Sequence, residues 1–155
     1  MKGQHTVATN RRARHDYAID ETLEAGLVLT GAEVKSLRAG RASLADAYGR
    51  VDGGEVWIEG LHIPPYEHDS RDRGRYEEKR PRKLLLHRAE IDRLVGKIKE
   101  RGMTLVPMRL YFVRGRAKLE LGLGRGKRQY EKRRSIAEKE QRREIERALS
   151  ARRRG

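Results

Sequence analysis

The last fifth of the chain, Arg125–Gly155, is too highly charged to belong to a hydrophobic core. Its 31 residues include thirteen Lys or Arg and five Asp or Glu, so the segment carries +8 of the net charge of +14. Burial of its few apolar residues cannot offset the entropy lost on ordering. No Gly or Pro interrupts Lys127–Arg154, the residues there favour helix, and a capping box at Ser135 and Glu138 marks one possible start. We therefore predict a basic C-terminal tail over residues 125–155 that is disordered in the free protein and becomes helical on a polyanion.

The overall charge points to nucleic acid as the leading class of partner. Lys and Arg number 37 against 23 Asp and Glu, and the sequence pI is about 10.5, so the protein should be drawn to phosphates. A membrane surface is the competing polyanion, but the tail lacks the broad apolar face of an interfacial helix. No apolar run approaches a signal peptide or a transmembrane span, and the chain has no Cys. We predict a soluble, cytoplasmic monomer without a membrane partner.

Alternating apolar residues predict a mainly β domain over residues 10–124. The expected strands lie at 17–29, 45–61, 83–86 and 104–124, the second and last of these being hairpins that turn at 52–54 and 114–115. Gly26 is expected to bend or bulge the first strand, and Pro107 is typical of an edge or a bulge. Residues 1–9 carry no periodicity and are predicted to be a flexible N-terminus.

Two helices are expected among these strands. Thr30 and Glu33 form a capping box that begins a short helix, which Gly40 can end. Residues 88–101 have apolar side chains at helical spacing, with His87 at the cap position. The segment 62–82 is expected to be the main loop. Together these elements predict a small antiparallel β-barrel of the oligonucleotide-binding type, with two to three helices.

No group of residues in the sequence is typical of an enzyme or a metal site. The five His show no metal-ligand spacing, and no Ser lies in a nucleophile elbow. Gly122, Gly124 and Gly126 precede Lys127 as glycines do in a phosphate-binding loop, but the spacing is wrong and Arg128 stands where Ser or Thr is required. We interpret these glycines as a flexible exit from the last strand, and we expect neither a metal nor a cofactor.

Basic residues at the surface of the domain are candidates for contacts with RNA phosphates. They are Arg11, Arg12, Arg14 and His15 before the first strand, Lys35 and Arg38 on the outer side of the first helix, Lys83 after the main loop, and Arg125, Lys127 and Arg128 where the tail begins. For the first group, a solvated basic edge is the alternative interpretation.

Four separated motifs occur in an order and spacing that resemble one known family. They are NRRARHDY at 10–17, GLVLTGAEVKSLRAGRASLADAY at 26–48, RKLLLHRAEI at 82–91 and GRGKRQYEKR at 124–133. From Asn10 onward, nearly the whole chain resembles the SsrA-binding protein family, SmpB. The resemblance implies a bacterial RNA-binding protein that partners transfer-messenger RNA (SsrA) in trans-translation, the rescue of stalled ribosomes, and that is not an enzyme.

The resemblance also implies roles for particular residues. Glu24, Leu85 and His87 match RNA-contacting positions of the family, in which many members carry Asn at the position of His87. The basic tail of the family enters the vacant messenger channel of the ribosome, next to small-subunit ribosomal RNA. The tail residues matching the contacts near the decoding centre are Tyr130, Glu131, Lys132 and Arg133. The family's barrel holds the tRNA-like domain of the RNA and stands where an anticodon arm would be.

Two other classes of function remain open from the sequence. A structural ribosomal protein with an RNA-binding barrel and a basic extension would have much the same composition. An RNA-modifying or RNA-cleaving enzyme is a weaker alternative, because no acid, base and nucleophile set is visible.

Overall fold

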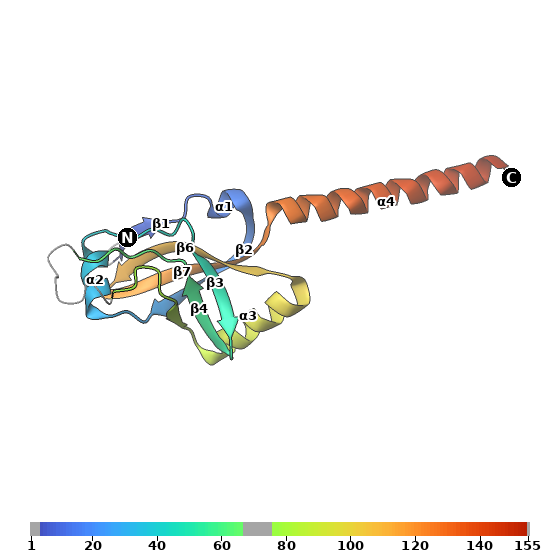
Figure 1. The fold of residues 1–155 in the computed structure, drawn as a ribbon. Coiled ribbons are helices and arrows are strands. Elements are labelled where there is room, and N and C mark those ends of the chain that lie inside the picture. Colours follow the sequence, from blue (N-terminus) through green and yellow to red (C-terminus); the bar gives the residue numbers. More distant parts are fainter. Residues whose placement is uncertain (1–3, 67–75, 155) are drawn as a thin grey trace.

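The fold is described from a computed structural model, which covers residues 4–66 and 76–154 and, at 128–137 and 152–154, the backbone only. The strands of the described chain form a single antiparallel sheet (Figure 1). Its strands are β1 (Gln4–Thr9), β2 (Tyr17–Leu27), β3 (Tyr48–Asp52), β4 (Glu55–Glu59), β5 (Arg82–Leu85), β6 (Thr104–Val113) and β7 (Arg116–Gly126). The helices in this part of the chain are α1 (Ala13–Asp16), α2 (Gly31–Arg38), α3 (Arg88–Arg101) and α4 (Lys127–Arg154).

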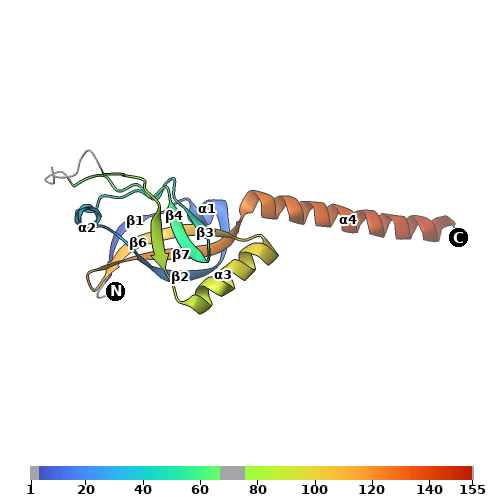
Figure 2. The same cartoon turned by 60° about the horizontal axis from the view of Figure 1, so that its bottom comes forward.

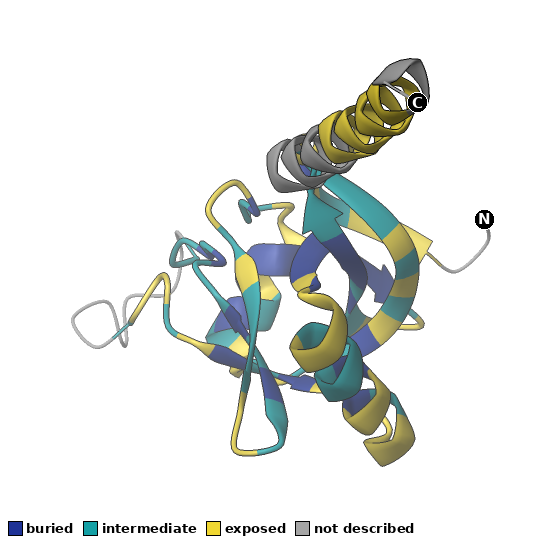
Figure 3. Cartoon of the chain, turned by 90° about the vertical axis from the view of Figure 1, so that its right-hand side faces the viewer, coloured by how far each residue is buried: buried dark blue, intermediate teal, exposed yellow. Residues whose placement is uncertain are grey.

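The sheet curls around a hydrophobic core without closing. Its strand order is β1-β6-β7-β2-β5-β4-β3, so β1 and β3 are the two edges. Viewed end-on, the curled strands surround a buried centre (Figure 3). Ile58, Leu84, Leu119 and Leu121 are almost completely buried there, and each such side chain contributes about 1.5–3 kcal/mol relative to an exposed one.

The predicted closed barrel is therefore wrong, and the reason lies in the first residues of the chain. Residues 4–9, predicted to be flexible, form β1, which pairs with β6 on the side away from β7. Both hydrogen-bonding edges of β6 are thus occupied. Strand β3 still packs closely against β6. Leu105 in β6 lies over Gly49 in β3, where an added Cβ would be only 2.5 Å from Leu105 Cβ. Within the described residues, no backbone ladder joins these two strands.

Local sequence signals set most of the remaining elements. The two hairpins turn where expected, with positive φ at Gly53 and Gly54 in one and at Arg114 and Gly115 in the other. Helix α2 has the predicted capping box: the Thr30 N–H donates to the Glu33 carboxylate at 2.9 Å, and the Glu33 N–H donates to Thr30 Oγ1 at 3.3 Å. Helix α3 spans 88–101 as predicted and ends at a left-handed Gly102.

Two expectations about glycine are contradicted, namely a bulge at Gly26 and a flexible exit from the last strand. Strand β2 is irregular between Ile19 and Glu21, whereas Gly26 pairs in regular register. The glycines at 122, 124 and 126 lie inside β7 rather than in a flexible exit. Gly124 permits β7 to approach β2 closely, because a Cβ there would overlap the backbone of Ala18. The irregularity expected at Pro107 is confirmed, since the β6 register shifts between Pro107 and Arg109.

A buried ion-pair network joins α2 to β5. Glu33 and Arg82 are 1% and 0% exposed, and Arg82 Nε donates to Glu33 Oε2 at 2.5 Å. Arg80 donates to the same carboxylate, and Arg82 Nη1 donates to the Leu61 carbonyl at 2.6 Å. Burial by itself would raise the pKa of Glu33, but the hydrogen bonds from Arg80 and Thr30 and the charge of Arg82 outweigh it and lower the pKa. The network fixes the end of the predicted 62–82 loop, of which residues 67–75 lie outside the described part.

The C-terminal segment is a helix in the protein itself, so the prediction that it is disordered when free is wrong. Helix α4 runs without interruption from Lys127 to Arg154 and projects away from the sheet (Figures 1 and 2). It begins eight residues before Ser135, which the capping box marked as one possible start, because β7 leads directly into it and its first part contacts α1 and β7. No helix in the described residues is long and apolar enough to cross a membrane.

Candidate nucleic-acid interface

The outer face of the sheet brings Glu24 and Leu85 together. Gly26 in β2 pairs with Leu85 in β5, so Leu85 and Glu24 point to the same side of the sheet. A Cβ at Gly26 would lie 3.2 Å from Leu85 Cβ, so the missing side chain gives Leu85 room to lie across β2. Leu85 is 53% exposed. An exposed leucine beside an exposed carboxylate offers both an apolar surface and a hydrogen-bond acceptor to a ligand.

Glu24 is held by a residue from the other half of the sheet. Tyr111 Oη in β6 donates to Glu24 Oε2 at 2.6 Å. The Tyr111 ring is 3% exposed and lies under the Arg109 guanidinium, whose carbon is 4.2 Å from the ring centroid. Burial, followed by the hydrogen bond to Glu24, raises the pKa of the Tyr111 phenol, so the phenol keeps its proton and donates.

Lys83 and His87 flank Leu85 along the chain. Lys83 points to the same face as Leu85 and its ammonium lies 3.1 Å from Glu55 Oε1. His87 is exposed at the cap of α3, where its backbone N–H donates to Glu90 Oε1 at 3.1 Å. The four predicted contact residues Glu24, Lys83, Leu85 and His87 thus come from β2, β5 and the start of α3, which adjoin one another.

The basic residues before β2 form a separate group at the end of the sheet where α4 begins. Arg11, Arg12, Arg14 and His15 are all exposed, in and just before the short helix α1. Arg12 and His15 both contact Asp16, at 3.8 and 2.9 Å. Arg125 in β7 pairs in register with Ala18, and its Nε is buried without a hydrogen-bond partner among the described residues.

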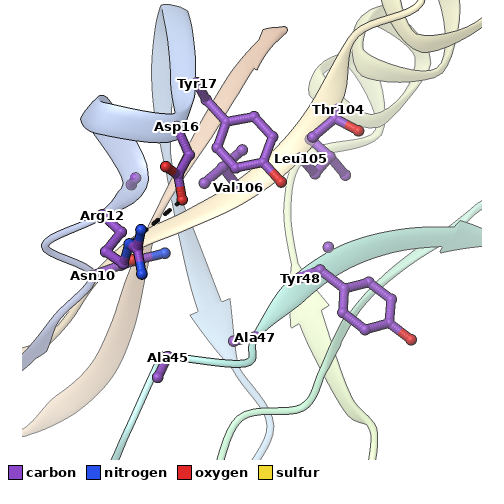
Figure 4. Close-up of a pocket in the computed structure, with 12 residues that line it drawn as sticks. Asn10, Arg12, Asp16, Tyr17, Ala45, Ala47, Tyr48, Thr104, Leu105 and Val106 are labelled. Atoms are coloured by element: carbon purple, nitrogen blue, oxygen red, sulfur yellow. Dashed lines mark ion pairs between the residues drawn. The ribbon is translucent and has the colours of Figure 1, made fainter. Parts of the chain in front are cut away.

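A pocket of about 330 Å³ opens beside this group, between α1 and the start of β3 (Figure 4). Arg12 and Asp16 line one side, Leu105 and Val106 line the base, and Tyr48 stands at the opposite rim. Tyr48 is 56% exposed. The pocket lies where β3 meets β6 through side chains, so it is a consequence of the open sheet.

The other predicted residues are more distant. Lys35 and Arg38 are exposed on α2, at the end of the sheet opposite to α4 (Figure 1). Lys127 begins α4, and every described side chain at 138–151 is exposed. The side chains of Arg128, Tyr130, Glu131, Lys132 and Arg133 lie outside those that the structure describes. The predicted residues therefore form three groups along the molecule rather than one compact site.

Sequence reasoning missed Tyr111, which contacts Glu24, and Arg109, which covers Tyr111. The signal available was parity: these two polar residues share one face of β6, whose other residues are mostly apolar. Their partner was not readable, because Glu24 lies 87 residues away in the chain. Among the described residues, no cluster of His, Asp or Glu could hold a metal ion. The basic residues therefore lie at the two ends of the sheet. Between them lies the patch of Glu24, Lys83, Leu85 and His87, in which Leu85 is the apolar member.

Comparison with known proteins identifies the family. A family model described as SmpB protein matches residues 7–151. The chain belongs to the SmpB family. The SmpB family consists of RNA-binding proteins that are not enzymes, so this protein is not an enzyme.

Curated relatives of the SmpB family match over nearly their whole length. The SsrA-binding protein of Thermobifida fusca (strain YX) is 59% identical over 152 residues, covering 98% of this chain and 94% of the relative. That of Acidothermus cellulolyticus is 56% identical and covers 99% and 95%. A solved structure described as "tmRNA-SmpB: a journey to the center of the bacterial ribosome" is 52% identical, with a TM-score of 0.62 over 76% of this chain and 82% of that one.

Proposed function

We propose that this protein binds transfer-messenger RNA and acts with it in trans-translation on stalled ribosomes. The observation that carries the proposal is the family match over residues 7–151, together with relatives named SsrA-binding protein, one of which is 59% identical. The net charge of +14 supports it, because structured RNA presents a dense array of phosphates. This function requires a cytoplasmic location, and we expect the protein to act as a monomer without a cofactor.

The proposed function divides between the two parts of the molecule. The sheet holds the tRNA-like domain of the RNA and stands in place of an anticodon arm. Its contacts are Glu24, Leu85 and His87 on the outer face, with Lys83 beside them. Phosphate contacts come from the basic residues at the two ends of the sheet, namely Arg11, Arg12, Arg14, His15 and Arg125 near α4 and Lys35 and Arg38 on α2.

Helix α4 supplies the ribosome-binding part. Its net positive charge and its exposed side chains at 138–151 suit a channel lined by small-subunit ribosomal RNA, and we propose that it occupies the vacant messenger path. Lys127 and Arg128 lie where the helix leaves the sheet. Tyr130, Glu131, Lys132 and Arg133 follow within the next two turns and are the proposed contacts near the decoding centre.

Recovery of the bound RNA tests the first part of the proposal. The full-length protein is expressed with an affinity tag in a bacterium, purified, and its RNA sequenced. Transfer-messenger RNA should be strongly enriched over other small RNAs. Co-purification at one copy per salt-washed ribosome, without transfer-messenger RNA, would instead favour a resident ribosomal protein and contradict the proposal.

Shortening the chain tests the division of labour. A protein ending at Gly126 retains all seven strands and should still bind transfer-messenger RNA, but it should not support peptide tagging on stalled ribosomes. Full tagging by this protein would contradict the role of α4. Replacing Tyr130 with Ala or Phe then separates base stacking from charge. Stacking predicts loss with Ala and retention with Phe, whereas charge alone predicts that both variants tag normally.

A further inference from the structure

We propose that Tyr111 is a positioning residue for RNA recognition, holding the Glu24 carboxylate so that its free oxygen accepts a hydrogen bond from the RNA. The proposal rests on the proposed function and adds to it the chemistry of one contact. It concerns three residues from two strands that are separated in sequence: Glu24 in β2, and Arg109 and Tyr111 in β6.

Glu24 differs from its neighbours in having a neutral partner. Of the six other carboxylates on the strands, all but Asp20 pair with a cation: Glu21 with Lys97 and Arg93, Asp52 and Glu59 with Arg50, Glu55 with Lys83, and Glu120 with Arg109. Glu24 is paired only with the phenol of Tyr111 among the described residues. The hydrogen bond fixes the carboxylate but gives it no ion-pair partner among the described residues, and it leaves Oε1 open to a ligand.

The support beneath Glu24 is itself fixed. Tyr111 is buried and covered by Arg109, which also bonds Thr6 Oγ1 at 3.1 Å and lies 3.6 Å from Glu120. Arg109 therefore ties Tyr111 to β1 on one side and to β7 on the other. Glu120 lies directly opposite Glu24 in the register of β2 and β7, and its pairing with Arg109 relieves repulsion between the two carboxylates.

The ligand chemistry follows from the charge of Glu24. A carboxylate repels phosphate but accepts hydrogen bonds from ribose 2′-hydroxyls and from base amino groups, both of which line the shallow minor groove of an RNA helix. The surroundings favour RNA over a basic protein, because two cations adjoin Tyr111, the partner of Glu24: Arg109 covers its ring, and Lys118 lies opposite it in β7. Leu85 adds an apolar surface on the opposite side, against which a ribose or base can pack.

Binding of the full-length protein to the tRNA-like domain of transfer-messenger RNA tests the proposal. Glu24→Gln should weaken affinity about tenfold, because a hydrogen bond to a charged acceptor is lost. Tyr111→Phe should weaken it about two- to tenfold, since the carboxylate must then be ordered on binding. The dependence of affinity on salt should keep its slope in both variants, because no phosphate contact changes.

A double-mutant cycle separates positioning from general damage to the fold. In the Glu24→Gln background, Tyr111→Phe should have no further effect on affinity. The matched control is Tyr76→Phe, which also removes a hydrogen bond from a partly buried phenol, here one of 2.8 Å to the Ile63 carbonyl, and which should bind RNA like the wild type. Equal effects of Tyr111→Phe in both backgrounds, or no effect in the wild type, would overturn the proposal.

Two further measurements distinguish this proposal from the proposed function. If the wild type binds the tRNA-like domain no better than an unrelated hairpin of equal length, the proposed function itself fails. If the wild type discriminates and Tyr111→Phe discriminates equally well, only the role of Tyr111 fails. RNA carrying 2′-deoxy substitutions identifies the donor: with a ribose donor, a substituted position abolishes the difference between wild type and Glu24→Gln, and with a base donor the difference persists.

Discussion

Leu119 and Leu149 have the same side chain but opposite surroundings. Leu119 in β7 is completely buried in the core of the curled sheet, whereas Leu149 in α4 is 49% exposed. The sheet domain is held together by burial and by long-range pairing across seven strands. Helix α4 has no core of its own and depends on residues that favour helix and on contacts near its start. The comparison teaches that a substitution in α4 should have little effect on the stability of the sheet domain, and that a substitution in the domain should have little effect on α4.

The largest effect is expected from the buried ion pair of the domain. Glu33→Ala leaves Arg82 charged, buried and without its main partner, which should lower the free energy of unfolding by about 3–5 kcal/mol. Urea unfolding followed by tryptophan fluorescence measures this, since Trp57 lies in β4. The control, Glu144→Ala on α4, should change stability by less than about 0.5 kcal/mol. A loss below about 1 kcal/mol for Glu33→Ala would contradict the buried network.

The two leucines give the next largest difference. Leu119→Ala should cost about 2–5 kcal/mol, because it removes buried methyl groups and leaves a cavity. Leu149→Ala should stay within about 0.5 kcal/mol in the same unfolding experiment. Similar losses for the two variants would mean that α4 packs against the domain far from its start, which would break the comparison.

A smaller effect is expected from helix propensity in α4. Ala148→Gly should destabilise the helix locally by about 1 kcal/mol, because Gly loses more backbone entropy than Ala. The helical signal in circular dichroism should fall, while the urea midpoint of the domain stays unchanged. Ala148→Gln is the matched control and should keep the signal. A shift of the domain midpoint in the glycine variant would show that the two parts unfold together.

The smallest effect concerns pH. A hydrogen bond from Lys97, assisted by the charge of Arg93, lowers the pKa of Glu21 below its ordinary value of 4.5. Its stabilisation is therefore present above about pH 4.5 and is lost as pH falls through the lower folded value. Glu21→Gln should reduce the free energy of unfolding by about 0.5 kcal/mol at pH 6 and by less at pH 3. An equal reduction at both pH values would exclude this ion pair as the cause.

The comparison also explains which features the sequence predicted. Hairpin turns and helix caps depend on residues a few positions apart, such as Thr30 and Glu33, and these were readable. The family followed from four motifs. Glu24 and Leu85 were named only through the resemblance to that family, and their contact with RNA stays a prediction. Closure of the sheet was predicted wrongly, because it depends on β1 pairing with a strand about a hundred residues away. The helical state of α4 was underestimated, because the entropy argument gave too little weight to its uninterrupted helix-forming residues.

Long-range polar contacts were beyond the sequence for a different reason. From the sequence, Arg82 is expected at the end of the 62–82 loop. In the structure it is fully buried against Glu33, 49 residues away. Tyr111 looked like one more residue of a strand, yet it meets Glu24 across the sheet. Both contacts require the register of several strands to be known before the partners can be matched.

The direct passage from β7 into α4 gives the molecule a fixed reach. Strand β7 ends at Gly126 and the helix begins at Lys127, so no linker separates them. At 1.5 Å per residue, the 28 residues of α4 span about 42 Å. One inserted residue would move every later charge by about 1.5 Å and turn it by about 100° around the helix axis. The position of each charged residue along α4 thus sets both its distance from the sheet and its direction around the helix axis.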